Sequence, residues 1–295
     1  MSSSTLWGCV WRKLNVERPA DFARPYSPRL FFQTVIARAY PRIIGTQREK
    51  SWLFFDVFLP MLAVSAYVFV YRAIGAPETY IGFVVMGGAM TAFWMNILWS
   101  MSSQLYWEKE QGNLALYIIA PNSLMAILLG MAFGGLVATT LRAFAIVLFG
   151  SLLFKVQFAV TSFLALFGTF TLTMVALYGM GMMFSSLFLL LNREAWHLAN
   201  LAQEPIYLLS GFYFPLRSLG FWVAASSSLI PLALGMDAMR QLVFLEGPSF
   251  GFLNVGIELA ILGALSVIFL IGARYLLAYM ERLAIREGRL TDSRR

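Results

Sequence analysis

The sequence predicts an all-α membrane protein with six transmembrane helices, an N-terminal amphipathic helix at the membrane interface and a re-entrant helical hairpin before the last span. Hydrophobic residues make up 59% of the 295 residues and charged residues only 13%, with a mean hydropathy of +0.72. A soluble domain carries about 25% charged residues. Long uncharged stretches separate two basic ends, and a membrane-crossing helix needs about 20 apolar residues. This composition excludes an ordinary soluble enzyme.

Residues 1–50 form a polar, cytoplasmic N-terminal segment in this prediction. Nine of the 22 basic residues lie in it. Over about residues 29–48, apolar residues recur at helical spacing and Arg38 and Arg42 add positive charge. The pattern is typical of an amphipathic helix in the membrane interface, which we expect to be interrupted at Pro41. A solvated basic helix bound to a partner is the alternative.

Six apolar stretches predict the spans of one domain over residues 51–281, which a basic cytoplasmic tail follows over residues 282–295. The expected spans cover about residues 52–71, 80–101, 123–152, part of 156–192, 195 to the SGFYFP motif, and 252–279. Residues 216–234 are apolar but broken by glycine, serine and proline. Broken backbone is tolerated at membrane depth only where protein or water covers it, so this stretch predicts a re-entrant pair of short helices.

The positions of lysine and arginine predict that both termini are cytoplasmic. With six spans, the side that holds both termini carries 17 of the 22 basic residues, and the opposite side carries four. The remaining one, Arg142, lies within a span. Positive residues stay on the cytoplasmic side of a membrane.

The sequence lacks the motifs of a catalytic or nucleotide-binding site. No glycine precedes a lysine, so there is no phosphate-binding P-loop. There is no HExxH, no GxSxG with triad partners and no paired-cysteine spacing, and the chain has one cysteine, Cys9, and one histidine, His197. We therefore expect no catalytic residues, no metal and no cofactor on this chain, and no nucleic-acid partner.

Charges within spans are costly, so each predicts a role. We expect Arg142 to line a water-filled pathway or to pair with Glu204 or Glu258; snorkelling to the outer interface is the alternative. Glu204-Pro205 combines a charge with a helix break, which favours a role in a pore or hinge over packing. Asp56 lies near the cytoplasmic end of its span and is expected to be an interfacial carboxylate.

Small and aromatic residues give two weaker indications. Gly130 and Gly134 form a GxxxG step, which allows two helices to approach closely but does not by itself indicate a dimer. The chain has 26 Phe, 12 Tyr and 8 Trp. Most are expected to be core or lipid-facing residues, and the alternative is that some line a path for an amphipathic or sugar-containing substrate.

Two segments together resemble the type 2 exporter permeases of the ATP-binding-cassette (ABC) superfamily. The first, residues 106–136, has acidic residues, a glycine and a short amphipathic stretch with a proline before a span. The second, residues 208–241, resembles the family's signature, although a usual leucine–proline pair reads Leu219-Gly220 here. The matching signature positions include Gly211, Pro215, Pro231, Asp237 and Arg240.

The resemblance implies a permease subunit that dimerises with a second permease copy, identical or different. A separate cytoplasmic ABC ATPase subunit would bind ATP and Mg²⁺, and the connection around Glu108, Glu110 and Gly112 would couple the permease to it. The amphipathic helix would be the interface helix, and residues 216–234 would close the outer mouth. Exporters of this family carry lipid-linked glycans, drugs or lipids across the plasma membrane.

Two other function classes stay open at this stage. A membrane-embedded transferase or protease would be active without a partner. A channel subunit would conduct ions without ATP. The sequence does not define the substrate.

Overall fold

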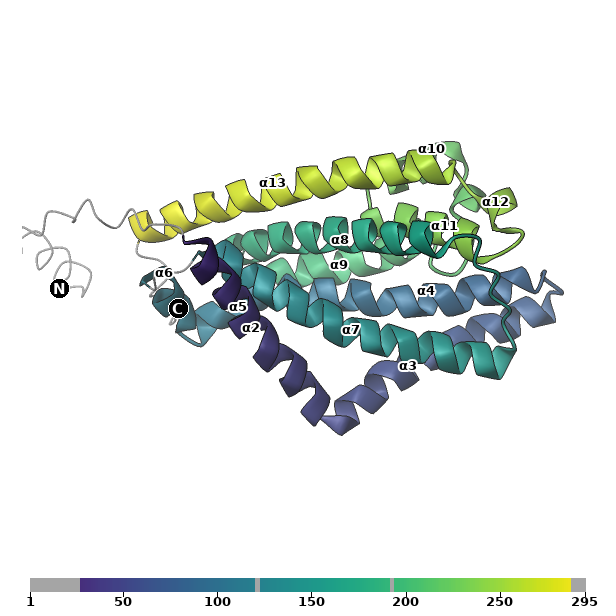
Figure 1. Ribbon diagram of the computed structural model, residues 1–295, viewed down its shortest axis with the longest axis horizontal. Helices are drawn as coiled ribbons and strands as arrows, with labels where there is room; N and C mark the ends of the chain where they lie inside the picture. Colours follow the sequence, from purple (N-terminus) through teal and green to yellow (C-terminus); the bar gives the residue numbers. More distant parts are fainter. Residues whose placement is uncertain (1–26, 120–122, 192–193, 288–295) are drawn as a thin grey trace, which may run out of the picture.

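A computed structural model gives the arrangement of most of the chain. It describes residues 27–119, 123–191 and 194–287. Within these stretches the regular structure is helical, with no strand. The helices pack along one long axis, and α2 begins at the same end of the bundle at which α13 ends (Figure 1). The predictions for residues 1–26, including Cys9, and for residues 288–295 lie outside the described residues.

Five helical segments of the described chain are long and apolar enough to cross a membrane. They are α3 (Lys50–Ala73), α4 (Thr79–Met95) with its continuation to Glu110, α7 (Leu124–Phe154), α8 (Phe163–Leu191) and α13 (Val255–Glu287). The predicted fifth span is α9 (Glu194–Leu209), whose 16 residues reach about 24 Å. It runs beside α8 and continues into the SGFYFP loop at the far end of the bundle (Figure 1). The predicted all-α membrane fold is confirmed.

The second span changes helix type before it ends. α4 is followed by a π-helix, η2 (Asn96–Met101), then by α5 (Gln104–Glu110) and α6 (Asn113–Ile119). The Ser102 amide donates to the Ile97 carbonyl at 2.9 Å, which is the i→i+5 bond of a π-turn. Such turns occur frequently at functional sites. This span is the central one, since 83% of its most apolar stretch is buried, against 17% for α3.

The N-terminal helix α2 (Pro28–Arg48) confirms the predicted helix but corrects two details. It continues through Pro41 instead of being interrupted there. A proline removes one hydrogen bond from a helix interior, and the contact of α2 with α7 holds the remaining turns in place. Arg38 and Arg42 face the bundle, whereas Phe32 and Ile36 are exposed. Two cationic residues of the predicted interface helix therefore face the protein and not the membrane interface.

The GxxxG step of α7 allows α2 to pack closely against it. A Cβ atom on Gly130 would lie 2.6 Å from the Val35 carbonyl oxygen, and one on Gly134 would lie 2.9 Å from the Ala39 carbonyl oxygen. Real Cβ atoms do not approach backbone oxygens this closely. The two glycines therefore bring together two helices of the same chain.

The predicted re-entrant hairpin is present at the end of the bundle opposite the start of α2 and the end of α13 (Figure 1). It consists of η3 (Leu216–Leu219), α10 (Phe221–Ser227) and α11 (Pro231–Val243), and the last two helices meet at 110°. The second limb reaches Val243, nine residues beyond the expected end at Leu234. A short helix, α12 (Gly247–Phe250), connects the hairpin to α13 (Figure 1).

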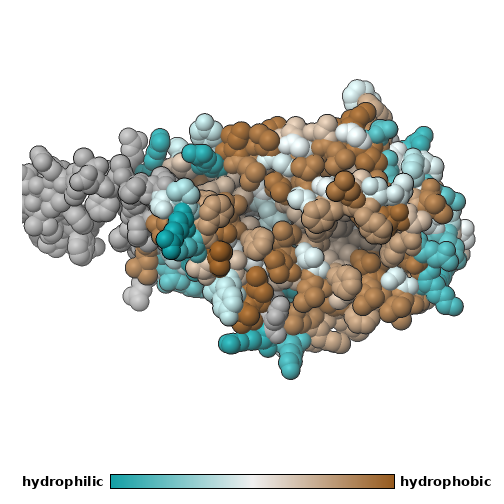
Figure 2. Space-filling model, viewed as in Figure 1, coloured by the Kyte–Doolittle hydropathy of each residue, from teal (hydrophilic) through white to brown (hydrophobic). Residues whose placement is uncertain are grey.

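The surface agrees with insertion in a bilayer. Hydrophobic residues cover the middle of the molecule, and hydrophilic residues gather toward both ends of its long axis (Figure 2). Large hydrophobic side chains are exposed along α3, α7 and α13. A soluble monomer rarely exposes apolar surface on this scale, so lipid or a second membrane subunit covers it.

Candidate functional site

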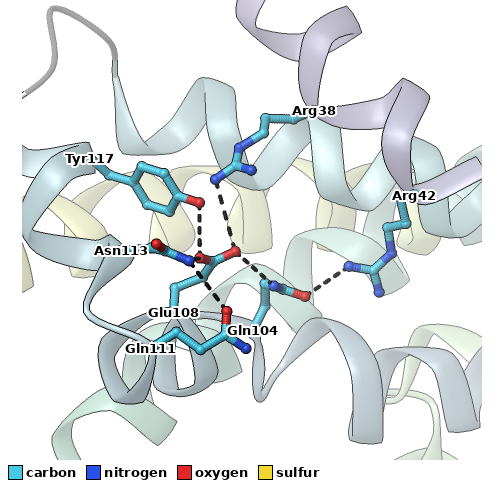
Figure 3. A network of polar contacts seen from close by, with 7 residues as sticks. All are labelled: Arg38, Arg42, Gln104, Glu108, Gln111, Asn113 and Tyr117. Carbon is cyan, nitrogen blue, oxygen red and sulfur yellow. Dashed lines mark hydrogen bonds and ion pairs between the residues drawn. The ribbon is translucent and has the colours of Figure 1, made fainter. Parts of the chain in front are cut away.

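One carboxylate holds the α5–α6 hairpin (residues 104–119) together. Glu108 accepts hydrogen bonds from Gln104 Nε2 at 3.2 Å, Asn113 Nδ2 at 3.0 Å and the Tyr117 hydroxyl at 2.8 Å (Figure 3). Gln104 precedes it by four residues and so shares its face of α5. Asn113 and Tyr117 come from α6. Glu108 is only 7% exposed, so these internal bonds, and not a partner protein, occupy most of its acceptor capacity.

Arg38 connects this hairpin to the interface helix. Its Nη2 atom lies 3.9 Å from Glu108 Oε1 (Figure 3). Its guanidinium carbon also lies 4.3 Å from the centroid of the Tyr117 ring, a cation–π distance. The arginine therefore contacts both short helices of the hairpin at once.

Arg42 makes a second connection, one helical turn along α2. It donates to Gln104 Oε1 at 2.9 Å (Figure 3) and to the hydroxyl of Ser100 within the π-helix. Burial lowers the pKa of Arg42, yet a guanidinium stays charged in proteins. Two arginines thus attach α2 to the end of the second span. We refer to Arg38, Arg42, Gln104, Glu108 and Tyr117 as the hairpin junction.

The three predicted coupling residues occupy different environments. Glu108 is buried, whereas Glu110 and Gly112 lie on the exposed tip of the hairpin together with Trp107 and Leu116. Gly112 has φ +78°, a conformation that side chains rarely adopt, and it makes the tight turn between the two helices. Of the three predicted coupling residues, Glu110 and Gly112 are therefore positioned to touch another protein directly, and Glu108 is not.

Arg240 of the signature pins the loop before the re-entrant hairpin. Its guanidinium donates to the backbone carbonyls of Gly211 at 2.7 Å, Phe212 at 2.6 Å and Phe214 at 3.0 Å. It also donates to the Phe83 carbonyl on α4 at 3.0 Å and lies 4.9 Å from the centroid of that ring. The residue is 2% exposed, so one buried cation ties α11, the SGFYFP loop and α4 together.

Asp237 belongs to a separate buried network that reaches the last span. It accepts from the Phe252 amide at 2.8 Å and from Gln241 Nε2 at 3.2 Å. The same Gln241 nitrogen donates to Glu258 Oε2 at 3.3 Å, and Glu258 Oε1 accepts from the Leu253 amide at 3.3 Å. Asp237 and Glu258 are 3% and 0% exposed. This network fixes α11 to the start of α13.

The glycine and prolines of the signature shape the backbone around these two networks. Gly211 has φ +61° and turns the chain at the end of α9. Pro215 precedes η3, and Pro231 occupies the first turn of α11, where a proline is favoured. We refer to the residues of the Arg240 and Asp237 networks together as the re-entrant junction. Its members are Phe83, Gly211, Phe212, Phe214, Asp237, Arg240, Gln241, Phe252, Leu253 and Glu258.

Arg142 pairs with a residue that was not predicted as its partner. Its Nη1 atom lies 2.6 Å from Asp56 Oδ2, which joins α7 to the start of α3. The predicted pairing with Glu204 or Glu258 is wrong, because Glu258 is enclosed in the re-entrant junction and Glu204 lies on α9. Asp56 neutralises the arginine, and both side chains remain partly exposed. A pathway role for Arg142 stays a prediction.

Glu204 and Pro205 lie on an exposed face of α9. The helix continues through Pro205 to Leu209. Among the described residues, the carboxylate of Glu204 accepts one long hydrogen bond, from Gln203 Nε2 at 3.5 Å. His197 lies on the same helix and is also exposed.

No group of three or more His, Cys, Asp or Glu side chains within the described stretches could hold a metal ion. The cavity of about 400 Å³ at the re-entrant end is open and lies between surface loops. Its polar lining includes Glu78, Lys155 and Glu246. These residues do not form a nucleotide site of the P-loop type, which needs a glycine-rich loop before a helix.

Sequence reasoning missed the α2 side of the hairpin junction. Arg38 and Arg42 lie four residues apart, and so do Gln104 and Glu108. Two polar pairs at that spacing each occupy one helix face. This signal could have indicated that the arginines face the hairpin instead of solvent.

Comparison with individual curated proteins gives no match. The family model described as ABC-2 type transporter matches residues 32–244. This range includes the whole hairpin junction, both helices of the re-entrant hairpin and Arg240. The match covers well over half of the chain and confirms the predicted family. The chain therefore belongs to the ABC-2 type transporter family, as a multi-pass permease subunit of an ABC transporter.

Proposed function

We propose that this permease exports an amphipathic substrate across the plasma membrane, using ATP that a separate cytoplasmic ABC ATPase hydrolyses. Both termini and the hairpin junction would lie in the cytoplasm, and the re-entrant junction would lie on the outside. The excess of basic residues on the terminal side supports this orientation. ATP and Mg²⁺ would bind to the partner, because this chain has no phosphate-binding loop.

The observation that carries the proposal is the construction of the α5–α6 hairpin. Its exposed tip presents Trp107, Glu110 and Leu116, while Glu108 beneath it binds both helices of the hairpin. An apolar and acidic tip on a rigid base is suited to fit a groove on another protein. A hairpin without the internal bonds of Glu108 would deform under load and would transmit little displacement.

Displacement of this tip has two routes into the membrane. α5 follows α4 through the π-helix, so the tip is directly connected to the central span. Arg38 and Arg42 attach α2, which in turn packs on α7 through Gly130 and Gly134. A rigid-body shift of the hairpin would therefore move α2 and the second span together. No catalytic side chain on this chain is needed for such a mechanism.

The substrate would pass between this permease and a second copy. The large apolar surface of α3 supports a membrane partner on that side, since only 17% of its most apolar stretch is buried. The re-entrant hairpin would close the outer mouth, held by Arg240 and Asp237.

Co-purification of a co-expressed ABC ATPase tests the proposal. The variant Glu110→Lys/Leu116→Asp changes charge and polarity at the tip without touching the bonds of Glu108. We expect the amount of bound ATPase to fall about tenfold or more, as for hot-spot residues of an interface. Glu246→Lys, an exposed carboxylate at the other end of the molecule, is the matched control and should leave binding unchanged.

Equal recovery of the ATPase with the tip variant Glu110→Lys/Leu116→Asp and with the control Glu246→Lys would contradict the assignment of the tip as the docking site. Transferase or protease activity of the chain purified alone would favour the enzyme alternative. Ion conductance without ATP would favour a channel subunit.

A further inference from the structure

Glu204 lies in the middle of an exposed stripe on α9. His197, Leu201, Glu204 and Leu208 recur at intervals of three and four residues and are all exposed. Residues at this spacing share one face of a helix. The stripe therefore places a carboxylate between two leucines on the outside of the predicted fifth span.

This carboxylate has no cationic partner within the described residues. The ion pairs there join Arg38 to Glu108 and Arg142 to Asp56, and the contact of Glu204 is the 3.5 Å hydrogen bond from Gln203. α9 is the predicted fifth span, and an ionisable side chain in a span usually faces a protein interior or a water-filled path, because its exposure to lipid is costly. The α9 stripe is thus expected to face a path and not lipid.

Three tyrosines form a chain of ring contacts that begins one helical turn after Glu204 and ends on α3. Tyr207 follows Glu204 by three residues on α9, so the two side chains are neighbours on the helix surface. The Tyr207 ring packs against Phe212, with centroids 5.2 Å apart, and Phe212 packs against Tyr213. The ring of Tyr67 on α3 stacks on that of Tyr213, with centroids 3.9 Å apart. The Tyr71 hydroxyl donates to the Tyr213 carbonyl at 2.9 Å, which holds α3 against this loop. We call Glu204, Tyr67, Tyr207 and Tyr213 the carboxylate–aromatic face.

We propose that the carboxylate–aromatic face binds the transported substrate, and that this substrate is a lipophilic organic cation. The inference rests on the proposed export function and names its substrate class. A carboxylate supplies the opposite charge, and tyrosine rings attract cations through their π faces. Leu201 and Leu208 supply apolar contact on either side.

The same chemistry opposes anionic cargo. A lipid-linked glycan carries phosphate groups, which Glu204 would repel at short range. Within the described residues, Arg142 on α7 is already bound to Asp56, and Arg240 on α11 to backbone carbonyls. The face therefore selects positive over negative amphiphiles.

Binding of a matched pair of lipophilic ions tests this proposal. Tetraphenylphosphonium and tetraphenylborate have nearly the same shape and opposite charge. The full chain is reconstituted without an ATPase in nanodiscs of zwitterionic lipid, and binding to empty nanodiscs is subtracted. We expect saturable binding of the phosphonium and none of the borate.

The variant Glu204→Gln keeps the shape of the side chain and removes its charge. It should weaken phosphonium binding about tenfold, and Glu204→Asp should restore most of the loss. Tyr213→Leu should weaken binding by about threefold, the scale of one cation–π contact. Glu78→Gln is the matched control. Glu78 is an exposed carboxylate just before α4, at the re-entrant end of the molecule, and this variant should bind phosphonium as the original chain does.

Equal binding of both ions, or unchanged phosphonium binding by Glu204→Gln, would overturn the proposal. An equal loss in Glu78→Gln would move the site to the outer surface and would overturn it too. The readout requires no ATPase, so its failure is distinct from loss of ATPase co-purification, which tests the export function itself.

Discussion

The two polar junctions of this permease are built in different ways. At the hairpin junction, side chains bind side chains: Glu108 is held by Gln104, Asn113 and Tyr117, and Arg38 approaches it at 3.9 Å. At the re-entrant junction, the buried side chain of Arg240 binds four backbone carbonyls, next to the buried network of Asp237, Gln241 and Glu258.

This difference predicts different mechanical behaviour. The side-chain contacts of Arg38 are partly exposed, so water can replace them at low cost when helices shift. The carbonyls that Arg240 binds are buried, and each would lose a hydrogen bond without compensation if the arginine moved away. The comparison indicates a rearrangeable joint at the ATPase side and a firmly held closure at the other. Four predictions test it, in order of decreasing effect.

Loss of Arg240 should have the largest effect on stability. Arg240→Met keeps the length of the side chain but leaves the four carbonyls without their donor. We expect the free energy of unfolding to fall by roughly 3–5 kcal/mol, measured by heat denaturation of the detergent-purified chain. Arg217→Met, at an exposed position of the same hairpin, should cost less than about 1 kcal/mol. Similar melting of the two variants would refute the special role of Arg240.

Alanine in place of a glycine beside the re-entrant junction should destabilise the chain more than alanine in place of a glycine on α7, where α2 packs. A Cβ on Gly87 would lie 1.6 Å from the Phe212 carbonyl oxygen, which Arg240 also binds, whereas one on Gly130 would lie 2.6 Å from that of Val35. We expect Gly87→Ala to destabilise by about 3 kcal/mol and Gly130→Ala by about 1–2 kcal/mol, since overpacking moves backbone in both.

Gly263→Ala is the control for these two variants, because its Cβ would meet nothing within 4 Å. The substitution should be neutral or slightly stabilising, as alanine is preferred over glycine inside helices. A lower melting temperature for Gly130→Ala than for Gly87→Ala would reverse the proposed order of the two junctions.

Glu108→Gln should uncouple the subunits while leaving them bound. The amide keeps part of the hydrogen bonding but removes the charge that faces Arg38, so α2 would be held to the hairpin mainly by Arg42 and would follow its movement less closely. We expect normal co-purification of the ATPase and a change of about fivefold to tenfold in ATP hydrolysis by the complex. Glu110→Gln, two residues along on the exposed tip, should instead weaken binding. Loss of binding by Glu108→Gln alone would assign it to the contact surface.

The smallest effect on stability is expected for the ion pair between Arg38 and Glu108. Arg38 and Glu108 are 3.9 Å apart, and the arginine side chain is 30% exposed. A double-mutant cycle of Arg38→Ala and Glu108→Ala, followed by heat denaturation, should give a coupling energy of about 0.2–1 kcal/mol. A coupling energy above about 2 kcal/mol would mean that this joint is as rigid as the re-entrant junction.

The spans and the re-entrant hairpin could be predicted from sequence because their causes are local. A long uncharged stretch of sequence predicts a span. Pro215, Gly220 and Pro231 break the helix around the hairpin. Family membership followed from motifs that are also local. The extent of α11 to Val243 was underestimated, because the buried Asp237 and Arg240 make a polar stretch part of the membrane fold.

The side-chain partners could not be predicted in the same way. Arg38 and Arg42 reach Glu108 and Gln104 across more than 60 residues of sequence, and hydropathy alone does not say which face of α2 meets the bundle. Arg142 was expected to pair with Glu204 or Glu258, and it is the packing of α3 on α7 that places Asp56 beside it instead. Long-range pairing of this kind depends on the assembled bundle.

Labelling of two single-cysteine variants tests the central claim most directly. In a chain with Cys9→Ser, Gln111→Cys reports on the hairpin tip and Ser218→Cys reports on the re-entrant end. We predict that a membrane-impermeant maleimide labels Ser218→Cys in intact cells and Gln111→Cys only after permeabilisation. A co-expressed ABC ATPase should protect Gln111→Cys alone. Labelling of Gln111→Cys in intact cells, or its full labelling in the presence of bound ATPase, would contradict the account.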